Sequence, residues 1–437
     1  MLDVRPRDLL HALLVAAAIG IPVSLAALAL LGASHQIGHW LWADIPAAGG
    51  FDPGAWWWVL LVPTVGGLLA GLAVRRLPGN GGHEPLHGFS ADPVQPAAIP
   101  GVVLAALATL PFGAVLGPEA PLVALGGALG LWFARMFRLT GQLAPLAGAA
   151  GLFASISALF GNPLLAAFLI LEVVGFAAVS APLAAVVLPG MLSAALGYLV
   201  FVGVGEWSGI TTTTFEPLVL PAYDTAQLGE LLGAVVVGVV LALLVHAIRV
   251  LARRVHPLVH RRPSVGAPAA GLVVGACAVL FGLLTGQSPG LLLFSGETDT
   301  GTVVEQAASW GTATLLLLVL LKAIAYAVSL GSLFRGGPVF PALFLGVVVG
   351  SLLATWVPDS QTAAVVGGMA AATAAMLRLP LSAVLLAVFL GGTTAIAATS
   401  VALIASVVAF VVTMALDRRA GGASGPATAP EGAAATP

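Results

Sequence analysis

Charged residues are scarce in this chain of 437 residues, because Asp, Glu, Lys and Arg together make up only 8% of it. A soluble domain carries about 25% charged residues, so the deficit excludes an ordinary soluble protein. A single cysteine, Cys277, excludes an internal disulfide and a thiolate metal cluster. The net charge of −2 gives no basis for binding nucleic acid. Hydrophobic residues fill 59% of the chain, and the sequence therefore predicts a multi-pass protein of the cell membrane, in contact with lipid.

Basic and acidic residues occupy different loops, and this division predicts the topology. Five arginines lie between Arg249 and Arg262, and the pair Arg75-Arg76 ends another apolar run. Cytoplasmic loops carry an excess of Lys and Arg, so both places should face the cytoplasm. The polar loop over 206–230 holds four acidic residues and no basic one, which predicts that it lies outside the cell. A second polar loop is predicted over 285–306.

Glycine and proline interrupt the apolar runs often, since the chain contains 54 Gly and 30 Pro. Pro121 and Pro163 each lead an apolar segment in the first half, and Pro341 and Pro380 lead the matching pair in the second. Paired broken helices indicate a binding site near the bilayer midplane, between two inverted repeats. We therefore predict an all-α polytopic membrane protein, with a transmembrane domain over 1–420 whose halves are about 1–205 and 231–420. The Ala/Gly/Pro/Thr-rich segment 421–437 is predicted to be a disordered tail.

One carboxylate, Glu119, stands inside almost unbroken apolar sequence, in the segment Gly117-Pro118-Glu119-Ala120-Pro121. A charge at bilayer depth costs at least ~2.5–3.5 kcal/mol, so such residues are usually kept for a function. The prolines predict a helix that begins inside the membrane, and the free N–H groups and dipole of such a helix start attract anions. Glu119 is predicted to occupy this anion site and to leave it when an anion competes or when it is protonated. The alternative is a purely structural acid at a helix start.

These segments resemble the CLC family of chloride channels and proton-coupled chloride exchangers. The segment around Glu119, with the glycines that follow it, is similar to that family's GREGP segment, and Gly336–Pro341 is similar to its GIFAP segment. The likeness is specific over about 116–173 and fair over about 322–390. It implies a CLC-like inverted repeat of broken and tilted helices and a homodimer with one pore per subunit. It also implies transport of inorganic anions, chloride first among them, with Glu119 as the gate.

The resemblance also implies which residues line the anion path. In the family, backbone groups of these two segments face the anion, together with a GSGIP loop that falls at Gly81–Pro85 here. The predicted anion-binding residues are Gly81, Gly82, Gly117, Glu119, Ala120, Gly337, Val339 and Phe340.

Several positions depart from the family's sequence. Pro118 and Pro338 stand where backbone amides would face the anion, and proline has no N–H to donate. Glu172 is a possible inner proton or pore acid, but Val173 stands where the exchangers carry their inner proton-transfer glutamate. We therefore expect channel-like or weakly coupled transport, with a proton/anion antiporter as the alternative. None of the three tyrosines in the chain matches the family's pore tyrosine near the C-terminus.

Two further groups of residues have competing interpretations. His83-Glu84-Pro85-Leu86-His87 matches H-E-x-x-H, so an intramembrane zinc metalloprotease is the rival of a different class, although Pro85 disfavours the helix that this motif needs. Lys322 is either a pore-side cation or a residue that extends to the membrane interface, and Arg335, beside the Gly336-Gly337 break, is a possible pore cation. Our expectation is a transporter and not an enzyme, with inorganic anions and possible protons as its partners and with no cofactor and no metal.

Overall fold

The computed structural model describes residues 6–88, 94–139, 141, 143–176, 183–208, 217–355 and 361–421, and the predicted disordered tail lies outside this range apart from Gly421. The described residues form helices joined by turns and loops. The α-helices are α1 (Pro6–His39), α2 (Ile45–Gly49), α3 (Trp56–Arg76), α4 (Ile99–Leu107), α5 (Glu119–Met136), α6 (Leu143–Phe160), α7 (Pro163–Phe176), α8 (Leu183–Ser208), α9 (Leu228–Arg261), α10 (Pro263–Thr285), α11 (Thr300–Gly331), α12 (Val339–Ala354), α13 (Gln361–Leu377), α14 (Pro380–Leu390), α15 (Gly392–Ala395) and α16 (Thr399–Gly421).

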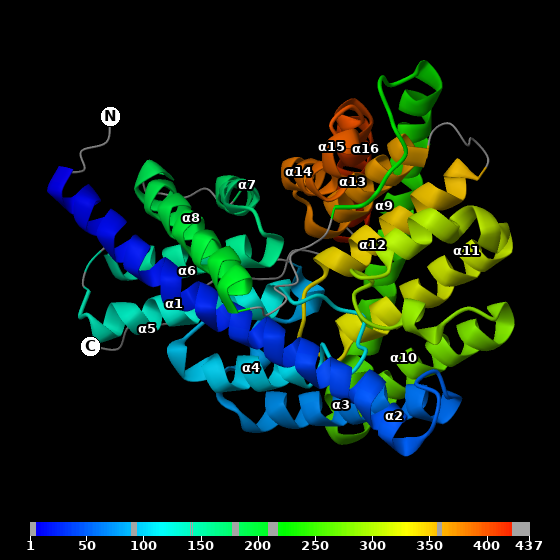
Figure 1. Ribbon diagram of the computed structural model, residues 1–437, viewed down its shortest axis with the longest axis horizontal. Coiled ribbons are helices and arrows are strands. Elements are labelled where there is room, and N and C mark those ends of the chain that lie inside the picture. Colours follow the sequence, from blue (N-terminus) through cyan, green and yellow to red (C-terminus); the bar gives the residue numbers. More distant parts are fainter. Residues whose placement is uncertain are drawn as a thin grey trace, which may run out of the picture.

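The helices fall into two groups that meet along the middle of the molecule. Figure 1 shows α4–α8 to the left and α9–α16 to the right, with α1 crossing the molecule diagonally and with α5 and α12 directed toward the boundary between the two groups. The series α5–α6–α7 matches the series α12–α13–α14. Pro121 and Pro341 are the third residues of α5 and α12, and Pro163 and Pro380 begin α7 and α14. This arrangement confirms the predicted helical repeat.

Glycines allow the paired helices of each repeat to approach closely. A Cβ added at Gly151 of α6 would overlap the carbonyl of Gly126 on α5, and one added at Gly368 of α13 would overlap the carbonyl of Gly346 on α12. In a membrane, lipid tails are as apolar as the helix surfaces, so helix association depends on such close packing of small residues. These glycines therefore allow the short distances between α5 and α6 and between α12 and α13.

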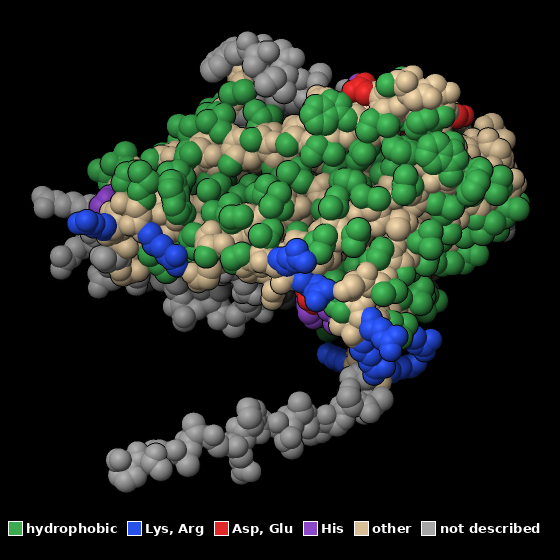
Figure 2. Space-filling view, turned by 90° about the horizontal axis from the view of Figure 1, so that it is seen from below, with side chains coloured by type: hydrophobic (Ala, Val, Ile, Leu, Met, Phe, Trp, Pro, Cys, Tyr) green, Lys and Arg blue, Asp and Glu red, His purple; other side chains and the backbone are tan. Residues whose placement is uncertain are grey.

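Eight helices among the described residues are long and apolar enough to cross a membrane. Figure 2 shows a broad apolar belt, with Lys and Arg gathered along one edge and acidic side chains at the opposite edge. This separation is the one expected when the basic edge faces the cytoplasm. One predicted boundary was wrong: the polar loop over 285–306 ends early, because α11 begins at Thr300 and continues to Gly331 with a kink at Gly311, where φ is +76°.

Candidate anion site

The broken ends of the two repeats are joined by a pair of backbone hydrogen bonds. The amide of Gly117 donates to the carbonyl of Gly337 at 2.8 Å, and the amide of Gly337 donates to the carbonyl of Gly117 at 2.6 Å. Gly117 lies two residues before α5 and Gly337 two residues before α12, so this short bridge holds the two helix starts against each other. The amides of these two glycines are therefore used by the fold.

Glu119 is fully buried at this junction, with 0% of its surface exposed. Its Oε1 accepts hydrogen bonds from the amide of Val339 and, at 3.3 Å, from the amide of Phe340, which are the first two residues of α12. Its Oε2 has no hydrogen-bond partner in the part of the chain that the structure describes. A Cβ at Gly117 or Gly337 would overlap the Glu119 carboxyl group, so both glycines are needed for the side chain to fit. The carboxylate thus occupies the anion-attracting end of α12.

A cavity of about 350 Å³ reaches this junction from the side on which α1 ends and α11 begins. His35, Pro118 and Glu297 are among the residues that line it. Burial, with a smaller contribution from the charge of Glu119, raises the pKa of Glu297 to about 7. Glu297 was not singled out from the sequence, because it lies in a polar loop with other acidic residues nearby. The cavity gives water or an ion access to the residue next to Glu119.

Tyr326 of α11 lies at the same junction, and it was not singled out from the sequence as a site residue. Its side chain is fully buried, and its hydroxyl donates to the carbonyl of Pro338 at 2.6 Å. Pro338 directly precedes the two amides that bind Glu119, so the tyrosine fixes the backbone at the start of α12. A lone tyrosine inside a long apolar helix was the signal available in the sequence.

Glu172, the second predicted acid, lies elsewhere and has different contacts. Its Oε1 accepts from the amide of Leu381 at 2.9 Å, and its Oε2 accepts from the amide of Ser382 at 2.7 Å. These amides belong to the first turn of α14, so Glu172 caps that helix from α7. Both carboxylate oxygens are used. A role in proton transfer stays a prediction.

The predicted loop glycines lie on a different side of the site from the cavity. Gly81 and Gly82 both have positive φ, +76° and +89°, and a Cβ at Gly82 would lie 3.5 Å from that of Ala124. Ala124 is one turn along α5 from Ala120, the predicted anion-binding residue, which is 8% exposed. The loop therefore packs on the first turns of α5, and its part in binding an anion stays a prediction.

Neither predicted pore cation contacts Glu119 in the structure. Lys322 is fully buried, and its Nζ donates to the carbonyls of Leu291, Leu293 and Phe294 at 3.0, 2.9 and 3.2 Å, so the interpretation as an interfacial residue was wrong. These bonds hold the loop before α11.

Arg335, the second predicted pore cation, is 2% exposed, and its Nε donates to the carbonyl of Asn80 at 3.0 Å. A direct effect of either cation on an anion stays a prediction.

The H-E-x-x-H segment does not form the helix that a zinc protease requires. Only Pro85–His87 makes a single 3-10 turn, with Glu84 in an extended conformation before it. The side chain of His87 is 74% exposed. His83 and His87 therefore do not lie one turn apart on a helix face, and Pro85 is the physical reason, because its ring and its missing N–H disfavour a helix interior.

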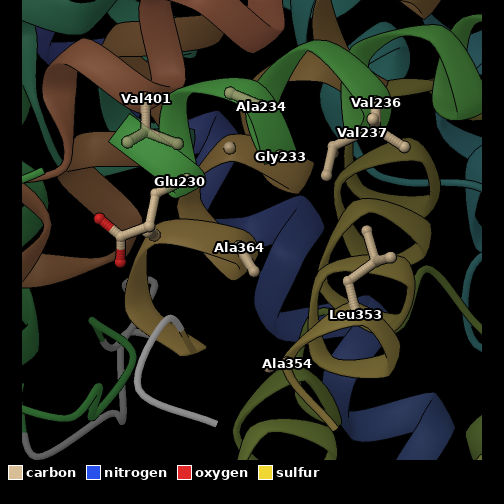
Figure 3. Close-up of a pocket in the computed structure, with 12 residues that line it drawn as sticks. Glu230, Gly233, Ala234, Val236, Val237, Leu353, Ala354, Ala364 and Val401 are labelled. Atoms are coloured by element: carbon tan, nitrogen blue, oxygen red, sulfur yellow. The ribbon is translucent and has the colours of Figure 1, made fainter. Parts of the chain in front are cut away.

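A further pocket, of about 220 Å³, lies between α9, α12, α13 and α16 (Figure 3) and is a different kind of site. The residues labelled in Figure 3 are Gly, Ala, Val and Leu, apart from Glu230 at one side of the pocket. The Glu230 carboxylate accepts from the Tyr223 hydroxyl at 2.6 Å and from the amide of Gln227 at 2.7 Å. None of the predicted anion-binding residues lines this pocket.

The inverted series of broken helices and a buried carboxylate at the junction define a CLC-type membrane transport protein. Residues 66–414 match the family described as "Voltage gated chloride channel". The Escherichia coli (strain K12 / DH10B) protein YfeO, provisionally named an ion-transport protein, is 30% identical over 365 residues, which cover 82% of each chain. This chain belongs to the voltage-gated chloride channel family.

Solved structures of other CLC proteins show the same fold. A slow cyanobacterial Cl⁻/H⁺ antiporter has a TM-score of 0.74 at 19% identity, and the match covers 97% of this chain and 100% of that one. A CLC-type fluoride/proton antiporter has a TM-score of 0.65 at 18% identity, covering 94% and 97%. A eukaryotic CLC transporter has a TM-score of 0.67 at 20% identity, covering 93% and 72%. The CLC-like fold predicted from the sequence is confirmed.

Proposed function

We propose that this chain conducts small inorganic anions, chloride first among them, and that the Glu119 carboxylate is the gate. One observation carries the proposal: Glu119 accepts the two amides at the start of α12, which are the donors that a dehydrated anion needs. An anion and the carboxylate compete for the same donors. Protonation of Glu119 removes its charge and weakens its hold on these amides, which frees them for the anion.

The number of available donors bears on affinity. Pro118 and Pro338 supply no N–H, and the amides of Gly117 and Gly337 bond each other. Val339 and Phe340 therefore supply the donors in α12, and an anion with few donors is incompletely compensated for its lost hydration. We infer that binding is weak and that transport is passive or weakly coupled to protons. Glu172, with both oxygens bonded, acts as a helix cap in this proposal.

Purified protein in lipid vesicles tests the proposal directly. Efflux of chloride, fluoride and nitrate is measured at neutral and acidic pH, for the natural chain and for Glu119→Gln. We expect acid to increase anion efflux in the natural chain and to have little effect in the variant. Equal pH dependence in both would exclude Glu119 as the gate. Uphill proton movement driven by a chloride gradient would instead favour the antiporter alternative.

The expected assembly is a homodimer, as the resemblance implies. Small residues line many helix surfaces of this chain, and such surfaces suit close helix packing in lipid. The mass of the protein in a mild detergent, measured together with anion flux from the same preparation, tests this expectation. An active monomer would contradict it.

A further inference from the structure

A second cluster of ionisable side chains lies at the basic, cytoplasmic edge of the protein. Glu84 comes from the segment that follows α3, and His256 and His260 lie one helical turn apart near the end of α9. The Nε2 of His256 is 3.5 Å from Glu84 Oε2, and the Nε2 of His260 is 3.8 Å from Glu84 Oε1. In Figure 2, His and acidic side chains lie beside Lys and Arg along this edge.

Hydrogen bonding determines which nitrogen of His260 faces Glu84. Its Nδ1 lies 2.8 Å from the carbonyl oxygen of His256, and a carbonyl only accepts, so Nδ1 carries a proton. In the neutral ring, Nε2 is then a lone-pair acceptor. It faces a carboxylate, which is also an acceptor. The Nε2 atoms of His256 and His260 are both buried, and neither has a hydrogen-bond partner among the described residues. Acceptors that face each other in this way are satisfied either by a proton on Nε2 or by a metal ion between them.

We propose that Glu84, His256 and His260 bind a divalent transition-metal ion of the zinc class. Ligand atoms at ~2.0–2.2 Å from a tetrahedral ion lie about 3.3–3.6 Å apart. The two separations of 3.5 and 3.8 Å are close to this, and one ligand atom from each residue lies within 4.8 Å of the others. The bond from His260 Nδ1 to a backbone carbonyl is also the usual outer contact of a metal-binding histidine, because it fixes the tautomer and the ring orientation.

Arg335 is the cation already nearest to Glu84, and it does not replace the proposed ion. One of its terminal nitrogens, Nη2, lies 3.5 Å from Glu84 Oε1, while its Nε donates to the carbonyl of Asn80. The guanidinium therefore contacts one carboxylate oxygen and supplies no hydrogen bond to either imidazole. The two imidazole rings stack with their centroids 3.8 Å apart and 21° between their planes, so a divalent ion that binds both of them and the carboxylate requires the rings to turn toward it. Three protein ligands leave a fourth position for water.

The proposed site joins two parts of the chain that are far apart in sequence. Glu84 follows the turn that contains Gly82, which packs on Ala124 of α5, whereas the histidines belong to α9. A bound ion links α9 to the loop that supports the start of α5. Because the ion binds the folded chain and an unfolded chain lacks the assembled site, it should also stabilise the fold.

Metal binding is tested on the full-length protein in detergent after removal of metal with a chelator. Calorimetric titration with Zn²⁺ measures affinity and stoichiometry, and Co²⁺ reports the coordination through its visible absorption. The variants are Glu84→Gln and the double variant His256→Gln/His260→Gln. His246→Gln is the matched control, because His246 lies on the same helix away from the cluster. Unfolding temperature and elution volume without metal check that every variant folds.

We expect one Zn²⁺ per chain, tetrahedral Co²⁺ absorption and a higher unfolding temperature with Zn²⁺. Loss of an outer contact costs about 10–100-fold in metal affinity, so loss of a ligand in Glu84→Gln or the double His variant should cost at least as much. His246→Gln should bind as the natural chain does. Absence of Zn²⁺ binding, or equal binding by the natural chain and both cluster variants, would overturn the proposal. These results do not depend on anion flux, so they are separate from the test of Glu119.

Discussion

Glu119 and Glu172 are two buried carboxylates in the first half of the chain, and each accepts backbone amides at the start of a helix in the second half. Glu119 meets Val339 and Phe340 of α12, and Glu172 meets Leu381 and Ser382 of α14. They differ in how completely they are bonded. Glu172 uses both oxygens, whereas Glu119 leaves Oε2 without a hydrogen-bond partner in the described part of the chain and lies next to a cavity that reaches Pro118.

This difference separates a structural cap from a movable one. A carboxylate with both oxygens bonded loses two charge-assisted hydrogen bonds if it leaves. A carboxylate with one unbonded, buried oxygen carries a desolvation cost that favours its departure or protonation. An acid that binds the start of a helix can therefore be a fixed cap, as Glu172 is, or a movable gate, as we propose for Glu119. The difference is whether its second carboxylate oxygen is also hydrogen-bonded.

The largest expected effect is on the pH dependence of anion flux. Glu119→Gln should raise flux at neutral pH about tenfold or more, which corresponds to ~1.4 kcal/mol of lost gate closure. Glu172→Gln should keep the natural pH dependence, because that side chain caps α14 and does not occupy the anion site. Flux from vesicles over a range of pH measures both. If Glu172→Gln removed the pH dependence and Glu119→Gln kept it, the two roles would have to be exchanged.

The free energy of unfolding should change more in Glu172→Gln than in Glu119→Gln, which is the reverse of their expected effects on flux. In Glu172→Gln the new NH2 group faces an amide N–H, and the unsatisfied donor should cost about 1–3 kcal/mol of unfolding free energy. Glu119→Gln should change stability less, since loss of its hydrogen bonds is offset by relief from burying a charge. Thermal or denaturant unfolding of the two purified variants in one detergent measures the difference. A greater loss of stability in Glu119→Gln would contradict the comparison.

Much of this arrangement was available from the sequence, and the missing parts have physical reasons. Charge at bilayer depth identified Glu119, and the prolines located the starts of α5, α7, α12 and α14. The partner of each carboxylate was not predictable, because it depends on how two segments about 200 residues apart pack, as in the bonds of Glu119 to Val339 and of Glu172 to Leu381. For the same reason Tyr326 and Glu297 were missed, and Lys322 was interpreted without the loop carbonyls that it binds.

The space around Glu119 gives a third test. In Gly337→Ala the added Cβ would overlap the Glu119 carboxyl group, and overpacking of this kind costs roughly 1–3 kcal/mol. In a Glu119→Ala background, Gly337→Ala should cost much less, because the three atoms nearest to a Cβ at position 337 all belong to Glu119. Unfolding free energies of the four proteins form a double-mutant cycle. Additive effects would show that the carboxylate does not occupy the place next to Gly337.

The hydroxyl of Tyr326 should have a smaller effect. Tyr326→Phe removes the bond to the carbonyl of Pro338 and should cost about 1 kcal/mol of stability. Because the start of α12 is then held less firmly, anion affinity should fall while the pH dependence set by Glu119 stays. Calorimetric titration with chloride, beside a flux measurement, separates the two. A Tyr198→Phe variant, in α8, controls for removal of a hydroxyl elsewhere.

The smallest expected effect uses Glu297 to report on the charge of Glu119. Burial and Glu119 raise the pKa of Glu297 to about 7, from an ordinary value of 4.5. A raised carboxyl pKa means that the folded chain binds the proton more tightly than the unfolded chain does. The corresponding stability is fully present below about pH 4.5 and is lost as the pH rises toward about 7. The difference in unfolding temperature between the natural chain and Glu297→Gln, followed against pH, isolates this contribution.

The other ionisable residues near Glu297 must be left unchanged in these variants. The pH dependence of Glu297 then compares the charges of Glu119 and Glu172. His35 and His39 line the same cavity, and Asp299 and Lys322 lie at the adjoining loop. In Glu119→Gln the nearby negative charge is gone, so the window in which Glu297 loses stability should move to lower pH, because burial alone then raises its pKa. In Glu172→Gln the window should stay, since that charge is not among the causes of the Glu297 shift. No shift in Glu119→Gln would mean that Glu119 carries no charge in the folded protein over this range, and the gate would then have to work by hydrogen bonding alone. A shift in Glu172→Gln would instead mean that the charge of Glu172 reaches Glu297.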